Sequence, residues 1–115
     1  MALTQWQQKQ WPRIERELAR VVEALRPLGV ERVVLYGSHA RGDFNQGSDI
    51  DLLIIWDTQE RIFDRIDRVL EAADSDLPLA PLVYSPGEYE RLRSQGASLI
   101  ESVEHEGRVL YERPR

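Results

Sequence analysis

The sequence predicts one α+β domain, a mixed β-sheet with helices packed against it, that takes up residues 1–115. The chain has 115 residues, which is the length of a single domain. Short β-branched runs are interspersed with segments whose apolar residues recur every three or four positions, a pattern typical of strands mixed with amphipathic helices. Some strands are joined by short loops and others by helical crossovers, which indicates a mixed sheet.

Residues 1–28 are predicted to form an N-terminal amphipathic helical segment. The apolar residues of one helix face are Ile14, Leu18, Val21, Val22, Leu25 and Leu28. Pro12 lacks an N–H and crowds the preceding turn, so the helix either begins near Pro12 or is kinked there. Gly29 predicts the helix end. In the part of this segment that precedes Pro12, Trp6 and Trp11 either pack on the sheet or form a partner-binding patch.

Two strands and a helix are predicted next. Glu31–Tyr36 is short, β-branched and flanked by glycines, which indicates a strand. Gly37–Ser48 predicts a turn followed by a brief helical stretch or a loop. Ile50–Trp56 is apolar on both faces and is therefore expected to be a central strand. Gln59–Ala73 carries apolar residues at helical spacing.

The last third of the chain predicts a strand, two helices and a final strand. Leu77–Tyr84 is expected at a sheet edge or with a bulge, because Pro78 and Pro81 cannot donate ladder hydrogen bonds. Ser85 and Glu88 have the spacing of a capping box with Pro86 between them, which predicts a helix start. The remaining elements are a helix ending near Ser94, a helix over Ala97–Glu104 and a strand over Arg108–Tyr111.

Composition excludes several classes of protein. No run approaches the roughly 18 apolar residues of a membrane span, and the polar segment Met1–Lys9 lacks the apolar core of a secretory signal. The absence of cysteine excludes disulfides and thiolate metal sites. We therefore expect a cytoplasmic protein with no membrane partner. The formal net charge of −5 disfavours direct binding of nucleic acid.

Asp49 and Asp51 are candidate metal ligands. Residues two apart in a strand point to the same side, so the two carboxylates repel each other unless a cation lies between them. Mg²⁺ prefers carboxylate and phosphate oxygens, and usually takes a few protein ligands together with substrate phosphate. The alternative interpretation, without a function, is that the two aspartates belong to a solvated turn ahead of a strand.

Gly37 and Ser38 supply the matching phosphate site. A glycine at the end of a strand lets the backbone approach a ligand closely. The Ser38 hydroxyl and the following N–H groups then face outward at a helix start, where donors are unpaired. Adjacent strands place Ser38 beside the aspartates. One group is expected to hold phosphate oxygens and the other the metal that bridges them.

The spacing of Gly37-Ser38, ten residues and then Asp49-Ile50-Asp51 resembles the signature of the nucleotidyltransferase superfamily related to DNA polymerase β. The triplet Ala40-Arg41-Gly42, the following Leu-Leu-Ile and the C-terminal segments around Tyr84 and Tyr111 look like its minimal nucleotidyltransferase branch. The resemblance extends from Val30 onward and implies the polymerase β-like nucleotidyltransferase fold.

The resemblance implies a Mg²⁺-dependent transfer of a nucleotide, with ATP as the substrate and a protein side chain as the acceptor. Asp49 and Asp51 then hold Mg²⁺ as catalytic residues, and Gly37 and Ser38 hold the β- and γ-phosphates. Arg41 contacts the triphosphate or shapes the loop. Members of the branch pair with HEPN-domain toxins, so the chain is expected to be the antitoxin of such a pair. In some of these pairs the nucleotidyltransferase adds AMP to a tyrosine of the toxin.

The resemblance also exposes one departure. The family has a third carboxylate on the neighbouring strand, and that position falls near Ala80 or Pro81, neither of which is acidic. Three readings stay open: Asp76 or Asp74 substitutes, one metal suffices, or the domain binds nucleotide but reacts poorly. In the last case the protein is an antitoxin that acts by direct binding. The acceptor, the preferred base and the oligomeric state are not encoded in any motif.

Overall fold

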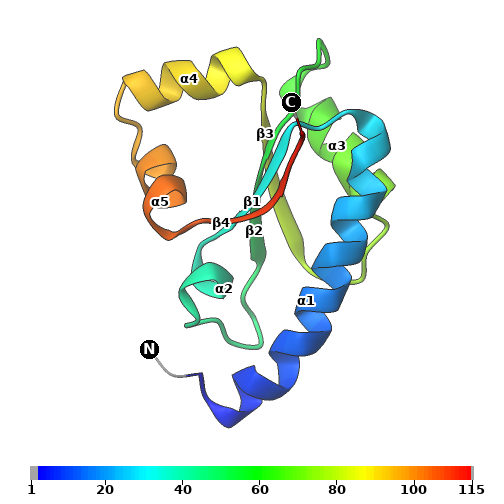
Figure 1. Cartoon of the computed structure of the whole chain (residues 1–115), viewed down its shortest axis with the longest axis vertical. Helices are drawn as coiled ribbons and strands as arrows, with labels where there is room; N and C mark the ends of the chain where they lie inside the picture. The colour runs from blue at the N-terminus through cyan, green and yellow to red at the C-terminus, as the bar shows by residue number, and fades with distance from the viewer. Residues whose placement is uncertain (1–2, 115) are drawn as a thin grey trace.

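The computed structural model describes residues 3–114, so residues 1 and 2 of the predicted N-terminal helical segment, and residue 115, lie outside the described part. A four-stranded sheet lies between helices on both faces (Figure 1). The elements in chain order are α1 (Gln5–Leu25), the 3-10 turn η1 (Arg26–Leu28), β1 (Arg32–Tyr36), α2 (Ser38–Arg41), β2 (Ile50–Ile55), α3 (Ile62–Ala73), β3 (Leu79–Tyr84), α4 (Pro86–Ser94), α5 (Ser98–Glu106) and β4 (Arg108–Glu112).

The sheet is mixed, with strand order β3-β2-β1-β4. Strand β1 is antiparallel to β2 and to β4, whereas β2 is parallel to β3. The predicted α+β class with a mixed sheet is therefore confirmed. Strand β2 is central, as its apolar run predicted, and β3 lies at an edge, as Pro78 and Pro81 predicted. An edge strand tolerates proline because one side of its backbone makes no ladder bond.

Each face of the sheet is covered by a different pair of helices. Val33, Leu35 and Leu52 belong to one core cluster with the apolar residues of α1 and α3. Val34 and Leu53, one residue further along the same strands, belong to a second cluster with residues of α4 and α5. Figure 1 shows α1 and α3 on one side of the sheet and α4 and α5 on the other. Odd-numbered positions of β2 therefore face α4 and α5.

Helix α1 runs through Pro12, so the alternative that the helix begins there is wrong. The start is fixed earlier by a capping box, in which the Thr4 hydroxyl accepts the Gln7 N–H at 3.1 Å and the Gln7 side chain accepts the Thr4 N–H at 2.8 Å. A capping box anchors two otherwise unpaired donors, which helps the first turns to form despite the proline. Gly29, with φ of 88°, ends the segment in the left-handed conformation as predicted.

The two tryptophans of the first turns of α1 pack against the loop between α2 and β2. The ring centroids of Trp6 and Trp11 lie 5.9 and 6.1 Å from that of Phe44, which is buried. The Gln7 amide also donates a buried hydrogen bond of 2.7 Å to the Phe44 carbonyl. Packing toward the sheet, as one alternative predicted, holds for Trp11, because the Arg108 guanidinium of β4 lies 5.6 Å from its ring centroid. Trp6 packs against Phe44 of the loop and is 40% exposed. These contacts fasten the loop between α2 and β2 to the start of α1.

A buried ion pair ties α3 to α4. The predicted capping box is present, with Ser85 accepting the Glu88 N–H at 3.2 Å. The same Glu88 carboxylate also accepts from Arg65 at 2.6 Å, and the side chain of Arg65 is only 8% exposed. Arg65 further donates to the Glu60 carbonyl at 2.7 Å. Glu88 is therefore both a helix cap and the counter-charge of Arg65.

No helix within residues 3–114 combines the length and hydrophobicity that a membrane crossing requires.

Candidate functional site

Asp49 and Asp51 lie at the amino end of the central strand. Asp51 is the second residue of β2 and is paired in register with Tyr36 of β1 and with Ala80 of β3. Its odd position turns it toward the face covered by α4 and α5. Asp49 precedes the strand and is exposed, whereas Asp51 is partly buried. The pair therefore stands where the apolar strand opens to solvent.

The two carboxylates act on each other electrostatically. The pKa of Asp51 is raised, first by burial and then by the negative charge of Asp49, while His39 and Arg41 oppose the rise. A cation between the carboxylates would remove this cost. Carboxylate oxygens are the hard ligands that Mg²⁺ prefers, so the pair stays a candidate for that role.

Gly37 lies directly against Asp51. It follows the last residue of β1 with φ of 76° and ψ of −153°, a conformation that essentially only glycine adopts. A Cβ at this position would collide with Oδ2 of Asp51. The Ala40 and Arg41 N–H groups bond the Gly37 carbonyl at 3.1 and 3.0 Å. The N–H groups of Ser38 and His39 belong to the first turn of α2, where a helix leaves its backbone donors without partners inside the helix.

Arg41 is engaged in two ion pairs. Its guanidinium bonds Oδ2 of Asp43 at 3.1 Å and Oε2 of Glu106 at 2.9 Å. The hydrogen bond to Glu106, and then that to Asp43, raises the pKa of Arg41. Because Glu106 ends α5, these contacts fasten α2 to the helical layer over the site. This arrangement matches the loop-shaping role that the sequence left open for Arg41, while a contact with phosphate stays a prediction.

The position of the missing third carboxylate is occupied by Ala80. It faces Asp51 in register on the neighbouring parallel strand, where the resemblance placed it. Asp74 and Asp76 are elsewhere, because both act on Arg20 of α1 and the Asp74 carbonyl accepts from that arginine at 3.2 Å. Asp76 also lines a surface recess with Arg13 and Arg20 of α1, and it precedes β3, which begins at Leu79. The reading in which Asp76 or Asp74 substitutes for the third carboxylate stays a prediction.

Within residues 3–114, no group of three or more His, Cys, Asp or Glu side chains is arranged to hold a metal ion. The candidate site thus offers two protein carboxylates, and further ligands would have to come from a nucleotide or from solvent. This donor set fits Mg²⁺, which usually binds through one or two carboxylates together with substrate phosphates.

Two residues next to the aspartates, Tyr36 and His39, were not among the predicted site residues. Tyr36 lies beside Asp51, and burial, followed by the charges of Asp51 and Tyr84, raises its pKa to about 12. It is the residue immediately before Gly37, so strand pairing with the Asp-x-Asp segment could have found it. His39 is buried and stacks on Phe44 at 4.4 Å between ring centroids. This stacking holds the loop between α2 and β2 against α2. Burial lowers the pKa of His39.

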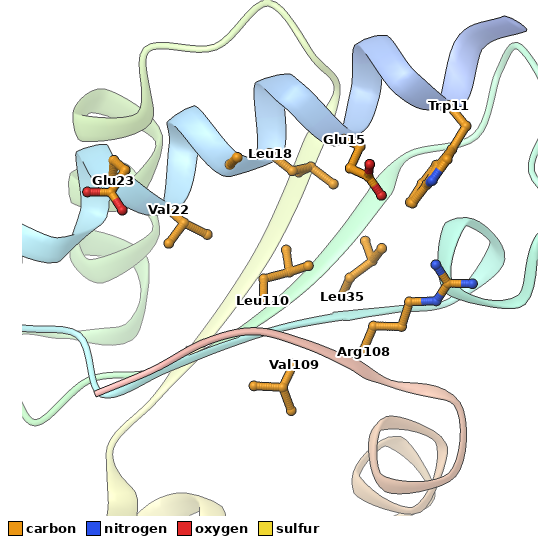
Figure 2. Close-up of a pocket in the computed structure, with 10 residues that line it drawn as sticks. Trp11, Glu15, Leu18, Val22, Glu23, Leu35, Arg108, Val109 and Leu110 are labelled. Atoms are coloured by element: carbon orange, nitrogen blue, oxygen red, sulfur yellow. The ribbon is translucent and has the colours of Figure 1, made fainter. Parts of the chain in front are cut away.

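A separate hollow of about 380 Å³ lies between α1 and the edge strand β4. Figure 2 shows Trp11, Leu18 and Val22 of α1 on one side of it and Leu110 and Arg108 of β4 on the other. The hollow is on the α1 face of the sheet, opposite the face that carries Asp51. It therefore does not belong to the aspartate site.

Two carboxylates beside a glycine-serine turn, at the end of a mixed sheet with helices on both faces, are the arrangement that the sequence predicted for a nucleotidyltransferase. The sequence profile described as "Nucleotidyltransferase domain" matches residues 15–111. The chain belongs to this nucleotidyltransferase domain family, and the predicted family resemblance and fold are confirmed.

Two curated relatives are archaeal proteins of Methanocaldococcus jannaschii. One, named as the candidate protein adenylyltransferase MJ0604, is 33% identical over 71% of this chain and 79% of its own length. The other, the candidate protein adenylyltransferase MJ0141, is 25% identical over 82% of this chain and 92% of its own length.

Solved structures share the fold. A candidate nucleotidyltransferase from Sulfolobus solfataricus superposes with a TM-score of 0.71 at 22% identity, covering 98% of this chain and 93% of that one. A toxin–antitoxin structure with AMP-PNP has a TM-score of 0.53 at 23% identity, covering 82% and 72%. A mutant of the toxin–antitoxin MntA-HpeT has a TM-score of 0.56 at 22% identity, covering 82% and 71%.

Replacing Gly37 by alanine is expected to destabilise the protein by about 1–3 kcal/mol, because the new Cβ meets the Asp51 carboxylate and the backbone conformation is strained. Urea unfolding followed by circular dichroism measures the effect. Gly87→Ala is the matched control. It lies in the first turn of α4 with no atom within 4 Å of the added Cβ, so a stability within about 1 kcal/mol of the parent is expected. Equal stability of both variants would contradict the Gly37–Asp51 contact.

The Asp51→Asn variant is expected to gain stability relative to the parent as the pH rises. The folded state raises the pKa of Asp51 above the ordinary aspartate value of 3.8, so the parent loses stability as the pH rises from 3.8 through the raised pKa. Asparagine does not titrate and escapes this loss. Unfolding free energies at acidic and neutral pH, without divalent metal, measure the difference between variant and parent. A difference that shrinks toward neutral pH would show that Asp51 is not held in an unfavourable environment.

Proposed function

We propose that the protein transfers AMP from ATP to a side chain of another protein in a Mg²⁺-dependent reaction. The observation that carries the proposal is the contact between the Gly37 backbone and Asp51, with Asp49 close by. This contact puts a candidate metal site and a candidate phosphate site side by side. Bound Mg²⁺ would neutralise phosphate charge and stabilise the leaving pyrophosphate.

The residues of the chain have separate tasks in this proposal. Asp49 and Asp51 hold Mg²⁺ through their carboxylates. Gly37, without a side chain, lets the triphosphate approach the backbone, and the Ser38 hydroxyl and N–H donate to the β- and γ-phosphates. Arg41 keeps α2 against α5 through Glu106 and thereby keeps these donors in position. Fixing the reacting groups in this way removes an entropic barrier to transfer.

The relatives support the choice of nucleotide and acceptor. Two curated relatives carry names of protein adenylyltransferases, and one structure of similar fold is a toxin–antitoxin with AMP-PNP, an ATP analogue. We infer that ATP is the nucleotide and that the acceptor is a toxin partner with a HEPN domain. The chain would then be the antitoxin of a cytoplasmic pair.

A second function is favoured by the alanine opposite Asp51. Without a third carboxylate at Ala80, no acidic group of that strand can activate the acceptor hydroxyl. The protein would then bind nucleotide, react weakly or not at all, and neutralise the toxin by direct binding.

Incubation with labelled ATP, Mg²⁺ and the protein encoded beside this chain should transfer label to that protein. Asp49→Ala combined with Asp51→Ala is expected to lower the rate by about 10³-fold or more, since losing the metal site forfeits several kcal/mol of stabilisation. Asp57→Ala is the matched control, because Asp57 is an exposed aspartate beyond the other end of β2. Neutralisation of the toxin by the double variant, without transfer by the parent, would select the binding function instead.

Ala80→Asp should restore the third carboxylate. Its side chain would lie beside Asp51 on the same sheet face, where it can bind a second metal ion and accept a proton from the acceptor. A transfer rate higher than the parent by about tenfold or more is expected, within the range that general base catalysis supplies. Ala80→Asn, similar in size but uncharged, should give no gain. A rate unchanged by Ala80→Asp would show that the two-carboxylate site is already sufficient.

A further inference from the structure

Helix α3 exposes more apolar surface than a helix that only covers a sheet requires. Phe63 is 82% exposed, Ile62 45% and Leu70 40%. The face of α3 that packs against the sheet is made by other residues, among them Val69 and Ala73, which are fully buried. An exposed phenylalanine on a charged surface contributes nothing to the core. Clustered exposed apolar residues mark interaction sites more often than scattered ones do.

Two of these residues share one side of α3, and the third lies at the start of the helix. Phe63 and Leu70 are seven residues apart, which is two helical turns, so they lie on the same outer side of α3. Ile62 borders a recess of about 320 Å³ that Tyr84 and Leu92 also line, between the start of α3 and α4. The strip thus runs from this recess along the outer face of α3. We call it the α3 strip.

Carboxylates flank the α3 strip on one side. Asp67 and Glu71 follow Phe63 by four and eight residues and are both exposed, and Asp64 stands in the first turn of the helix. Within residues 3–114 none of these three carboxylates makes an ion pair, whereas the neighbouring Arg68 is bonded to Glu60 at 2.6 Å. The flank therefore presents uncompensated negative charge next to apolar side chains.

We propose that the α3 strip is the docking surface for an amphipathic helix of the toxin partner, with apolar residues one heptad apart and lysine or arginine along one edge. An apolar strip with an i, i+7 repeat fits the apolar face of a second helix. The unpaired carboxylates fit its basic edge and discriminate against acidic helices. This inference rests on the proposed function for the identity of the partner.

The α3 strip is separate from the nucleotide site. Helix α3 covers the α1 face of the sheet, whereas Asp51 faces α4 and α5 (Figure 1). A partner helix held on α3 leaves the aspartates accessible. Docking and transfer can therefore be measured independently, and a variant of one surface should leave the other intact.

The test measures the dissociation constant of the full chain and the purified toxin partner by calorimetry, without ATP. Phe63→Ser combined with Leu70→Ser is expected to weaken binding by about 10²-fold, as loss of central apolar anchors does. Val109→Ser is the matched control, because Val109 is 48% exposed but belongs to β4. Glu71→Lys is expected to weaken binding about tenfold, and Glu101→Lys on α5 to leave it within twofold. Circular dichroism and the urea midpoint check that each variant is folded.

The outcomes separate the two proposals. If no AMP is transferred but binding depends on Phe63, Leu70 and Glu71, the docking surface stands and the proposed activity fails. If AMP is transferred while the Phe63→Ser, Leu70→Ser variant binds within twofold of the parent, the docking surface is overturned. Absence of any complex with the parent chain, or tighter binding after Glu71→Lys, overturns it as well.

Discussion

The site depends on one close contact, that between the backbone of Gly37 and the carboxylate of Asp51. Because the Asp51 carboxylate of β2 lies against the residue that follows β1, that residue must be glycine. Apolar residues of β2 are buried on both faces of the sheet, so the core fixes the position of Asp51 beside the turn. Burial and the charge of Asp49 disfavour the ionised form of Asp51 and raise its pKa, and a bound cation would offset that cost. Such unfavourable local arrangements are common where a protein binds or reacts.

Much of the scaffold could be predicted because its signals are local. Prolines at 78 and 81 indicated an edge strand, the β-branched and apolar run of β2 indicated a central one, and Ser85 with Glu88 indicated a helix start. Pro12 left two possible starts for α1 in the sequence, and the helix takes the earlier one because Thr4 and Gln7 form a capping box. The buried Arg65 was not predicted either. Its partners are brought together only by the tertiary fold.

The site was predictable in part for a different reason. Asp49, Asp51, Gly37 and Ser38 lie in two short segments, and strand pairing is enough to bring those segments together. The resemblance placed the third carboxylate near Ala80 or Pro81, and the register of the parallel pair puts Ala80 opposite Asp51. Asp76 precedes β3, and a residue outside a strand no longer follows its pleat. The ion pair between Arg41 and Glu106 spans most of the chain, and no sequence pattern connects two such positions.

The anchoring of Phe44 has a consequence for how the molecule moves. The segment that carries the aspartates is pinned by Gln7, Trp6 and Trp11, all within the first two turns of α1. Helix ends fray more readily than helix centres, and here the first turns of α1 contact the loop that precedes the aspartates. Unwinding of these turns would remove the contacts that hold Phe44 in place. A ligand that immobilises this loop is therefore expected to stabilise the beginning of α1 as well.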